Sequence, residues 1–111
     1  MPGFFYFVCM FYIYILYSKQ YDKYYIGHSD NYLQRLIQHN TQEHFNTYTS
    51  KFRPWTLAVV FECGQSRKEA LRLERFIKSQ KSRKLIEQLT DPFFIPQDSL
   101  ALLVRVPHMR D

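Results

Sequence analysis

The chain of 111 residues has the length of a single domain. With 46% hydrophobic and 23% charged residues it can bury a core, which excludes an intrinsically disordered chain. The formal net charge of +5 indicates a polyanionic partner, most commonly nucleic acid and less commonly an anionic membrane, although the same charge is also typical of a surface that is merely soluble.

Two cysteines, Cys9 and Cys63, lie in apolar runs without a CxxC motif or a Cys/His cluster. This pattern argues against a disulfide scaffold and a zinc site, and it predicts a reducing, cytoplasmic location. The apolar run over residues 4–17 is shorter than the roughly 20 residues that span a bilayer. No Lys or Arg precedes it and no cleavage site follows it, so we expect no membrane association. Residues 1–9 are interpreted as a prefix to a domain that starts at Met10, either an over-extended gene start or an extra edge strand.

The first half of the chain predicts a hairpin followed by a helix. Residues 11–17 are rich in aromatic and β-branched side chains, and the polar residues after them predict a turn into an antiparallel strand over residues 23–26. Gly27 follows, where a side chain would obstruct a bend or the close approach of a ligand. Asp30 is the expected N-cap of a helix over residues 31–40.

The second half predicts one strand, two helices and a tail. Residues 55–63 form an apolar run that is typical of a buried central strand. A helix over residues 67–79 opens on a Ser-x-x-Glu capping box, and a third helix covers residues 82–89. Asp91-Pro92 ends that helix, and residues 100–106 favour at most a short strand.

These elements predict an α+β domain with the order β-β-α-β-α-α. Its helices are expected to pack against a small three-stranded sheet that is antiparallel or mixed. The domain is expected over residues 10–90, and residues 91–111 form a tail without an assigned role.

Glu74 is the sharpest candidate for chemistry. On its predicted helix it lies about 40° from Ala70, at the edge of the buried face that Ala70, Leu73 and Ile77 form. A carboxylate beside an apolar stripe is costly unless a cation or a metal ion compensates it. The alternative is an i,i+4 ion pair with Lys78 at the edge of the stripe, and the helix pattern does not decide between the two.

Arg35 and His39 lie one helical turn apart, nearly opposite an apolar stripe of Leu33, Leu36 and Ile37. They can converge on one ligand, with Arg35 holding a phosphate bidentately and His39 taking part in proton transfer. A solvated polar helix face often produces such a pair, and spacing alone favours that alternative.

Tyr14 and Tyr25 fall on the two strands of the hairpin, where packing is the more common role in a chain with nine tyrosines. Because a tyrosine hydroxyl has a pKa of about 10, it acts as a base at neutral pH only beside cations or a metal ion. Residues 67–84 hold eight basic and two acidic side chains, which fits either phosphate-backbone contact or an ordinary solvated face.

In combination, these residues resemble the GIY-YIG endonuclease family. The matching motifs are Tyr12-Ile13-Tyr14, then Tyr25-Ile26-Gly27 after ten residues, Arg35, His39-Asn40, Thr49, Pro54-Trp55, Glu69-Ala70, Glu74 and Lys81-Ser82-Arg83-Lys84. The resemblance covers residues 10–89 and is strongest to the small stand-alone bacterial members, which are similar to the nuclease domain of the excinuclease C subunit.

The resemblance implies an endonuclease that hydrolyses DNA phosphodiesters with Mg²⁺ or Mn²⁺ as its only cofactor. Its substrate would be branched, damaged or loosely specified DNA, as in DNA repair or recombination. Tyr14 would act as the general base or orient the attacking water, and Tyr25 would orient the phosphate. Arg35 would steady the phosphate charge, and His39 would support proton transfer. Glu74 would bind the metal ion.

Further residues take expected roles from the same resemblance. His28 stands where some members carry Lys, and it would assist the reaction. The basic side chains expected to contact DNA are Lys51, Arg53, Arg67, Arg72, Arg75, Lys78, Lys81, Arg83 and Lys84.

Two departures from the family pattern keep an alternative open. Tyr12 replaces the first glycine of the motif, as aromatic residues do in similar small members. Residues 89–92 contain no asparagine, although many members place one near the active site after the last helix. The alternative is therefore a module with the same fold that binds nucleic acid without cleaving it.

Overall fold

A computed structural model describes residues 9–107 of the chain. Its sheet contains β1 (Tyr12–Ser18), β2 (Lys23–Ser29), β3 (Thr56–Glu62) and β4 (Val104–Arg105), in the spatial order β2-β1-β3-β4. Every neighbouring pair is antiparallel. The predicted hairpin and central strand are confirmed. The expected prefix lies almost wholly outside the described residues.

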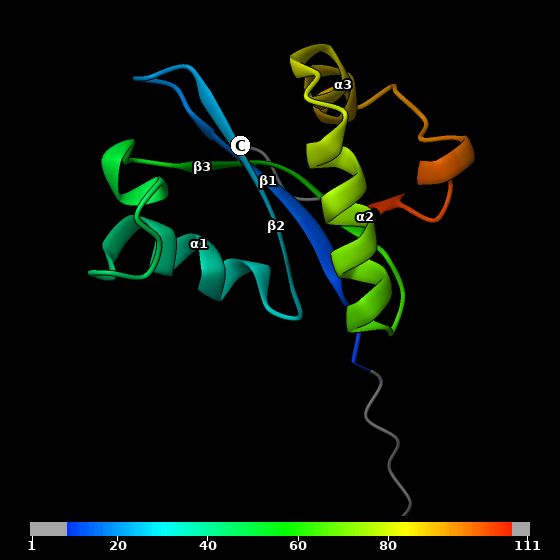
Figure 1. Ribbon diagram of the computed structural model, residues 1–111, viewed down its shortest axis with the longest axis horizontal. Coiled ribbons are helices and arrows are strands. Elements are labelled where there is room, and N and C mark those ends of the chain that lie inside the picture. Colours follow the sequence, from blue (N-terminus) through cyan, green and yellow to red (C-terminus); the bar gives the residue numbers. More distant parts are fainter. Residues whose placement is uncertain (1–8, 108–111) are drawn as a thin grey trace, which may run out of the picture.

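Helices cover both faces of this sheet. Helix α1 (Tyr32–Thr41) packs on one face, and α2 (Arg67–Ser79) and α3 (Arg83–Thr90) pack on the other, so that the sheet runs between them in Figure 1. Two short 3-10 turns, Thr49–Lys51 and Asp98–Leu100, interrupt the connecting segments. The α+β class and the three helices are thus as predicted within the part of the chain described.

Alternation along β1 explains why both faces carry a core. Ile13 and Ile15 point to the side of α2 and α3, and both side chains are fully buried. Tyr14 and Leu16 point to the side of α1, where they pack with Trp55. Because successive side chains of a strand alternate between faces, a strand buried on both sides is apolar throughout.

Side chains cap the helices where polar residues precede them. Ser66 accepts a hydrogen bond from the backbone N–H of Glu69 at 3.1 Å, which confirms one half of the predicted capping box, while the Glu69 carboxylate pairs with Arg72. For α1, Asp30 is the wrong residue, because Asn31 accepts from the backbone N–H of Gln34 at 3.1 Å. The helix starts one residue later because β2 extends to Ser29, whose hydroxyl accepts from the backbone N–H of Asn31.

The prediction of three strands is wrong, because β4 adds a fourth beside β3. Val104 pairs with Glu62 and Arg105 pairs with Phe61. The Arg105 guanidinium donates to the backbone carbonyls of Leu89, Asp91 and Phe94, which ties the segment after α3 to the sheet. The short strand considered for residues 100–106 is thus present as Val104–Arg105, although the predicted sheet does not include it. Two residues carry too little alternation to distinguish a strand from a loop.

Replacing Leu103 by Ala is expected to lower the free energy of unfolding by about 2–4 kcal/mol. Leu103 is only 4% exposed and belongs to the core under α2 and α3, so truncation leaves a cavity there. Its neighbour Leu102 is 48% exposed and provides the matched control, Leu102→Ala, with little expected effect. Urea unfolding followed by circular dichroism measures both. Equal losses in the two variants would contradict the packing described for residues 91–107.

Within residues 9–107, none of the helices has both the length and the apolar character required to cross a bilayer. Both cysteines are free, with Cys9 exposed and Cys63 buried.

Candidate active site

A cavity of about 330 Å³ lies at β2, the edge strand, and draws side chains from both faces of the sheet. All five residues predicted to be catalytic line it, and so does His28. The complete lining consists of Tyr14, Tyr25, Gly27, His28, Arg35, His39, Phe45, Asn46, Arg67 and Glu74. The structure therefore brings together residues that are widely separated in the sequence.

Gly27 makes room for the ring of Tyr14. The two residues are cross-strand partners between β1 and β2. A Cβ atom at position 27 would lie 2.5 Å from both Cζ and the hydroxyl oxygen of Tyr14. The sequence predicts a bend or the close approach of a ligand at Gly27, whereas the group that approaches is the tyrosine of the neighbouring strand.

His39 connects the two hydroxyls of Tyr14 and Thr49. Its Nε2 lies 2.9 Å from the Tyr14 hydroxyl, and its Nδ1 lies 2.8 Å from Oγ1 of Thr49. The imidazole is 1% exposed, so the interpretation of this position as a solvated helix face is wrong. Instead Leu33 and Ile37, from the apolar stripe, are 57% and 62% exposed. His39 lies inside because β1 offers the Tyr14 hydroxyl to one ring nitrogen and the 3-10 turn at Thr49–Lys51 offers the Thr49 hydroxyl to the other. Leu36, the third residue of the stripe, packs on the same side of the sheet.

Burial keeps His39 neutral. Burial, together with the positive charges of Arg35 and Arg53, lowers the pKa of His39 to about 4. At neutral pH one ring nitrogen therefore donates and the other accepts. This pairing lets the Tyr14 hydroxyl donate to Nε2 while Nδ1–H donates to Thr49.

The depressed pKa of His39 makes stability depend on pH. The unfolded pKa of 6.5 lies above the folded value of about 4, so stability is complete above pH 6.5 and is lost as the pH falls towards 4. Between pH 7.5 and pH 5, wild type is expected to lose about 2 kcal/mol more than a His39→Gln variant. Urea unfolding at both pH values measures the difference. His44→Gln, at an exposed position, serves as the control, and an identical pH dependence in wild type and His39→Gln would contradict the prediction.

The two tyrosine hydroxyls are also protonated at neutral pH. Burial raises the pKa of Tyr14, with smaller contributions from the neighbouring Tyr25, which raises it, and Arg35, which opposes the shift. Burial likewise raises the pKa of Tyr25. A tyrosinate is therefore absent from the resting site, and Tyr14 contributes an O–H group bound to His39.

Asn46 forms a hydrogen bond with the hydroxyl of Tyr25, and the sequence did not predict it as a residue of the site. Its amide nitrogen donates to the Tyr25 hydroxyl at 3.3 Å, and its amide oxygen accepts from the backbone N–H of Thr49 at 2.9 Å. Nothing in the polar segment after α1 distinguishes this asparagine from its neighbours, because its partner lies on β2.

Arg35 has a charge that is available to the cavity. Its guanidinium donates to the side chain of Gln38 at 2.9 Å and lies 5.6 Å from the ring centre of Phe45. Among the ion pairs of residues 9–107 none involves Arg35 or Arg67, which also lines the cavity. An anion in the cavity therefore meets two guanidinium groups without acidic partners.

Glu74 contacts basic side chains on both of its oxygens. Its Oε1 lies 2.5 Å from Nδ1 of His28 on β2, and its Oε2 lies 2.7 Å from Nζ of Lys78. The ion pair considered as the alternative role of Glu74 is thus present. The carboxylate also reaches the cavity, although only 13% of its side chain is exposed.

The donor set fits a hard cation such as Mg²⁺ or Mn²⁺. Glu74 is the only carboxylate in the cavity lining. Residues 9–107 contain no cluster of three His, Cys, Asp or Glu side chains of the kind that encloses a zinc ion. Mg²⁺ commonly binds through one or two carboxylates and completes its coordination with water and phosphate oxygens. Both oxygens of Glu74 already contact a basic side chain, so a bound cation would have to share or displace one of these contacts.

The predicted DNA-contacting residues fall into two groups. The side chains of Lys51, Arg67, Arg75, Lys81 and Lys84 are exposed and form no ion pair within the described chain. The others have partners inside the protein. Lys78 contacts Glu74, Arg72 contacts Glu69, and Arg53 donates to the backbone carbonyls of His39 and Gln42.

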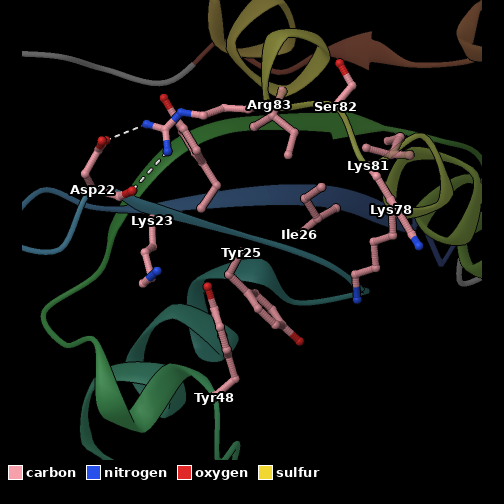
Figure 2. A pocket seen from close by; sticks show the side chains of 12 residues that line it. Asp22, Lys23, Tyr25, Ile26, Tyr48, Lys78, Lys81, Ser82 and Arg83 are labelled. Carbon is pink, nitrogen blue, oxygen red and sulfur yellow. Dashed lines mark hydrogen bonds and ion pairs between the residues drawn. The ribbon is translucent and has the colours of Figure 1, made fainter.

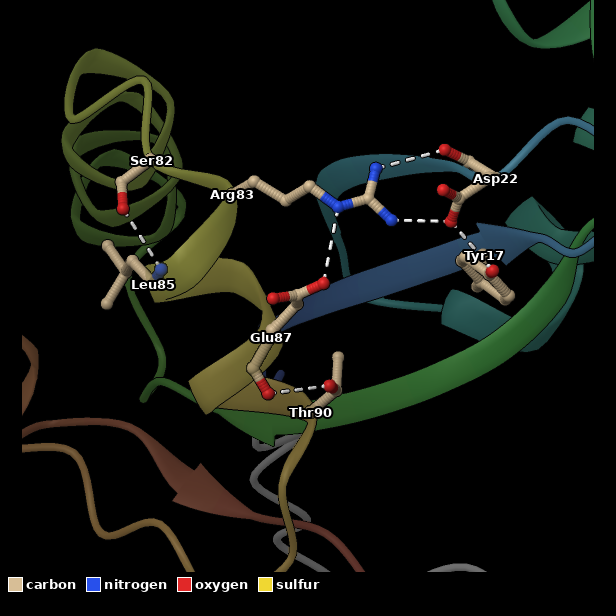
Figure 3. A network of polar contacts seen from close by, with 7 residues as sticks. All are labelled: Tyr17, Asp22, Ser82, Arg83, Leu85, Glu87 and Thr90. Atoms are coloured by element: carbon tan, nitrogen blue, oxygen red, sulfur yellow. Dashed lines mark hydrogen bonds and ion pairs between the residues drawn. The ribbon is translucent and has the colours of Figure 1, made fainter.

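Arg83 belongs to the second group and joins α3 to the turn between β1 and β2. It pairs with Asp22 at 2.5 Å and with Glu87 at 3.2 Å, as Figure 3 shows. Asp22 also accepts from the hydroxyl of Tyr17 at 2.8 Å. The charge of Arg83 is therefore matched within the protein, and its contacts are those of a structural residue.

Comparison with known proteins gives one family match, over most of the chain. The family model that describes the GIY-YIG catalytic domain matches residues 10–87. A search of curated proteins found no match. The matched segment begins just before β1, ends within α3 and contains every residue predicted to be catalytic. The chain therefore belongs to the GIY-YIG catalytic domain family, whose members are generally endonucleases and typically depend on a divalent metal ion.

Proposed function

We propose that the protein is an endonuclease that hydrolyses DNA phosphodiester bonds with the help of Mg²⁺ or Mn²⁺. The observation that carries this proposal is the single cavity shared by Arg35, Glu74 and the Tyr14–His39 pair. Hydrolysis of a phosphodiester needs an oriented water, a positive environment for the phosphate and a path for the proton. The three groups supply these needs in one place.

The hydrogen bond between Tyr14 and His39 supports a relay for the proton. The Tyr14 oxygen accepts a proton from the attacking water while its own proton passes to Nε2 of His39. The water oxygen bonds to phosphorus, the P–O bond to the leaving sugar oxygen breaks, and that oxygen takes up a proton from solvent. No tyrosinate is required, which agrees with the raised pKa of Tyr14. The arriving phosphate offsets the charge of Arg35, one cause of the depressed pKa of His39, and so makes the imidazole a better proton acceptor.

Arg35 and Glu74 act on the phosphate from opposite faces of β2. Arg35 binds its non-bridging oxygens and stabilises the charge that develops on them. A divalent cation on Glu74 would supply further charge neutralisation and acidify a bound water. His28 fixes one oxygen of Glu74, and Lys78 shifts from the other oxygen towards the DNA.

Tyr25 and Asn46 orient the reacting groups. The Tyr25 hydroxyl faces the cavity and is held by the Asn46 amide. We assign to Asn46 the positioning role that the missing asparagine after the last helix leaves open. Arg67, which also lines the cavity, binds a phosphate next to the one that is cut.

Incubation of the full chain with labelled duplex, single-stranded and branched DNAs tests the proposed function. Cleavage is expected with Mg²⁺ or Mn²⁺ and not with EDTA. DNA binding that weakens steeply with salt but gives no cleavage under any of these conditions would instead support the non-catalytic module. That alternative is favoured by one observation, the Lys78 ammonium on the carboxylate of Glu74.

A further inference from the structure

A second cavity, of about 380 Å³, adjoins the candidate active site. Two residues connect the cavities. Tyr25 lines both of them. Lys78 lines the second cavity and contacts Glu74, which lines the first. Figure 2 shows Tyr25 and Tyr48 on one side of this space and the lysines at the end of α2 on another. The proposed reaction uses Tyr25 and Lys78 but assigns no role to the other residues that line this cavity.

The first feature of this cavity is an aromatic surface. Tyr48 is 42% exposed, and its ring stacks with that of Tyr25 at a centroid distance of 6.4 Å and an angle of 29°. The centroid of the Tyr48 ring also lies 5.1 Å from that of Phe52 and 6.3 Å from that of Trp55. These contacts fix the orientation of Tyr48 and leave part of its ring open to the cavity.

The second feature is an excess of positive charge. Lys23, Lys78 and Lys81 line the cavity, and its one acidic residue, Asp22, is already paired with Arg83. Lys81 is exposed at the junction of α2 and α3 and has no ion-pair partner in the described chain. A ligand that fits this cavity therefore carries negative charge beside an aromatic or apolar group.

A nucleotide with an unstacked base has this combination. Aromatic side chains bind bases by stacking on their faces, and lysines bind the phosphates between them. In a duplex the base faces are covered by their neighbours, so only an unpaired nucleotide can use Tyr48. The volume of about 380 Å³ is also near the lower limit of small-ligand pockets, and a duplex is far too wide to enter.

We propose that the cavity lined by Tyr48, Lys23 and Lys81 binds an unpaired nucleotide next to the phosphate that is cut. The preferred substrate is then DNA with a single-stranded segment beside the cleavage site, such as a flap or a junction of single and double strands. This inference rests on the proposed function for the position of the cut, whereas the binding of the nucleotide can be measured without cleavage.

The test compares binding of a blunt duplex with binding of the same duplex bearing a five-nucleotide flap, in EDTA so that no DNA is cut. Fluorescence anisotropy measures affinity, and a 2-aminopurine in the first unpaired position reports stacking. Wild type is expected to bind the flapped DNA about tenfold more tightly and to quench the probe. Tyr48→Ala is expected to lose about tenfold in flap affinity and the quenching, with duplex binding unchanged.

Matched variants separate this role from general effects. Tyr48→Phe keeps the ring and should retain the flap preference. Tyr21→Ala removes a tyrosine of similar exposure, 44%, that also contacts Phe52 but lies outside the cavity, and it should behave as wild type. Lys81 has a positive φ of 49°, which asparagine adopts readily, so Lys81→Asn removes the charge without straining the backbone. Lys81→Asn should weaken flap binding more than Lys19→Asn, which removes an exposed charge away from the cavity.

The outcomes distinguish the two proposals. Equal affinity of wild type for both DNAs, or an equal loss for both in Tyr48→Ala, would overturn the nucleotide subsite even if the protein cleaves DNA. Flap preference and quenching that depend on Tyr48, found in a protein that never cleaves, would support the subsite and refute the endonuclease.

Discussion

Glu74→Gln is expected to reduce the rate of DNA cleavage by roughly 1000-fold, because it removes the only carboxylate that residues 9–107 place in the cavity lining. Glutamine keeps the size of the side chain, so the packing of α2 against the sheet remains. A neutral amide is a poor ligand for Mg²⁺, and without the cation the charge on the phosphate is left to Arg35. DNA affinity is expected to stay the same or to rise slightly, since one negative charge is lost.

The control for this experiment lies on the same helix. Glu69 pairs with Arg72 and lies outside the cavity, so that Glu69→Gln removes an equal charge away from the site. Single-turnover cleavage of a labelled DNA measures both variants across a range of Mg²⁺ concentrations. If Glu74→Gln and wild type release product at the same rate, Glu74 does not hold the catalytic metal ion.

Tyr14→Phe is expected to lower the cleavage rate by about 100- to 1000-fold, because the relay from water to His39 loses its middle group. Phenylalanine still fits over Gly27, so the hairpin remains intact. The loss of the hydroxyl also leaves Nε2 of His39 without its partner inside a buried site. We therefore expect unfolding to become easier by about 1–3 kcal/mol, and activity must be measured well below the melting temperature.

Tyr12→Phe is the matched control, since Tyr12 lies two residues earlier on the same strand and does not line the cavity. Both variants are compared by single-turnover rates and by DNA affinity. A loss of binding in Tyr14→Phe equal to its loss of rate would assign Tyr14 to substrate binding and exclude the relay.

The elements of this fold could be predicted from sequence wherever local chemistry specifies them. The capping box of Ser66 and Glu69 marks the start of α2, and the apolar run of β3 marks a buried strand. The tail shows the limit of this reasoning. Arg105 holds the tail by donating hydrogen bonds to backbone carbonyls, and no sequence pattern identifies such acceptors. Strand β4 has too few residues for its side chains to show an alternation of apolar and polar character.

The orientation of α1 shows the same limit at the site itself. Its apolar stripe predicts that Leu33 and Ile37 face the protein, yet both are exposed and His39 is buried. Periodicity measures the hydrophobicity of one element and not the polar partners that another element offers. Here the hydroxyls of Tyr14 and Thr49 hold His39 inside, and of the predicted stripe only Leu36 packs against the core. The motif resemblance groups His39 with Tyr14 because it relates residues across elements, and the structure places the two side chains 2.9 Å apart.

The residues of the candidate site lie on both faces of β2, so the site is complete only after α2 has been synthesised. As the chain leaves the ribosome, β1, β2 and α1 appear first and carry the tyrosines, Arg35 and His39. The carboxylate arrives only with α2, which packs on the opposite face. A partly synthesised or truncated chain therefore lacks the residue proposed to hold the metal ion, so the proposed nuclease remains harmless to DNA until both layers of the protein are in place.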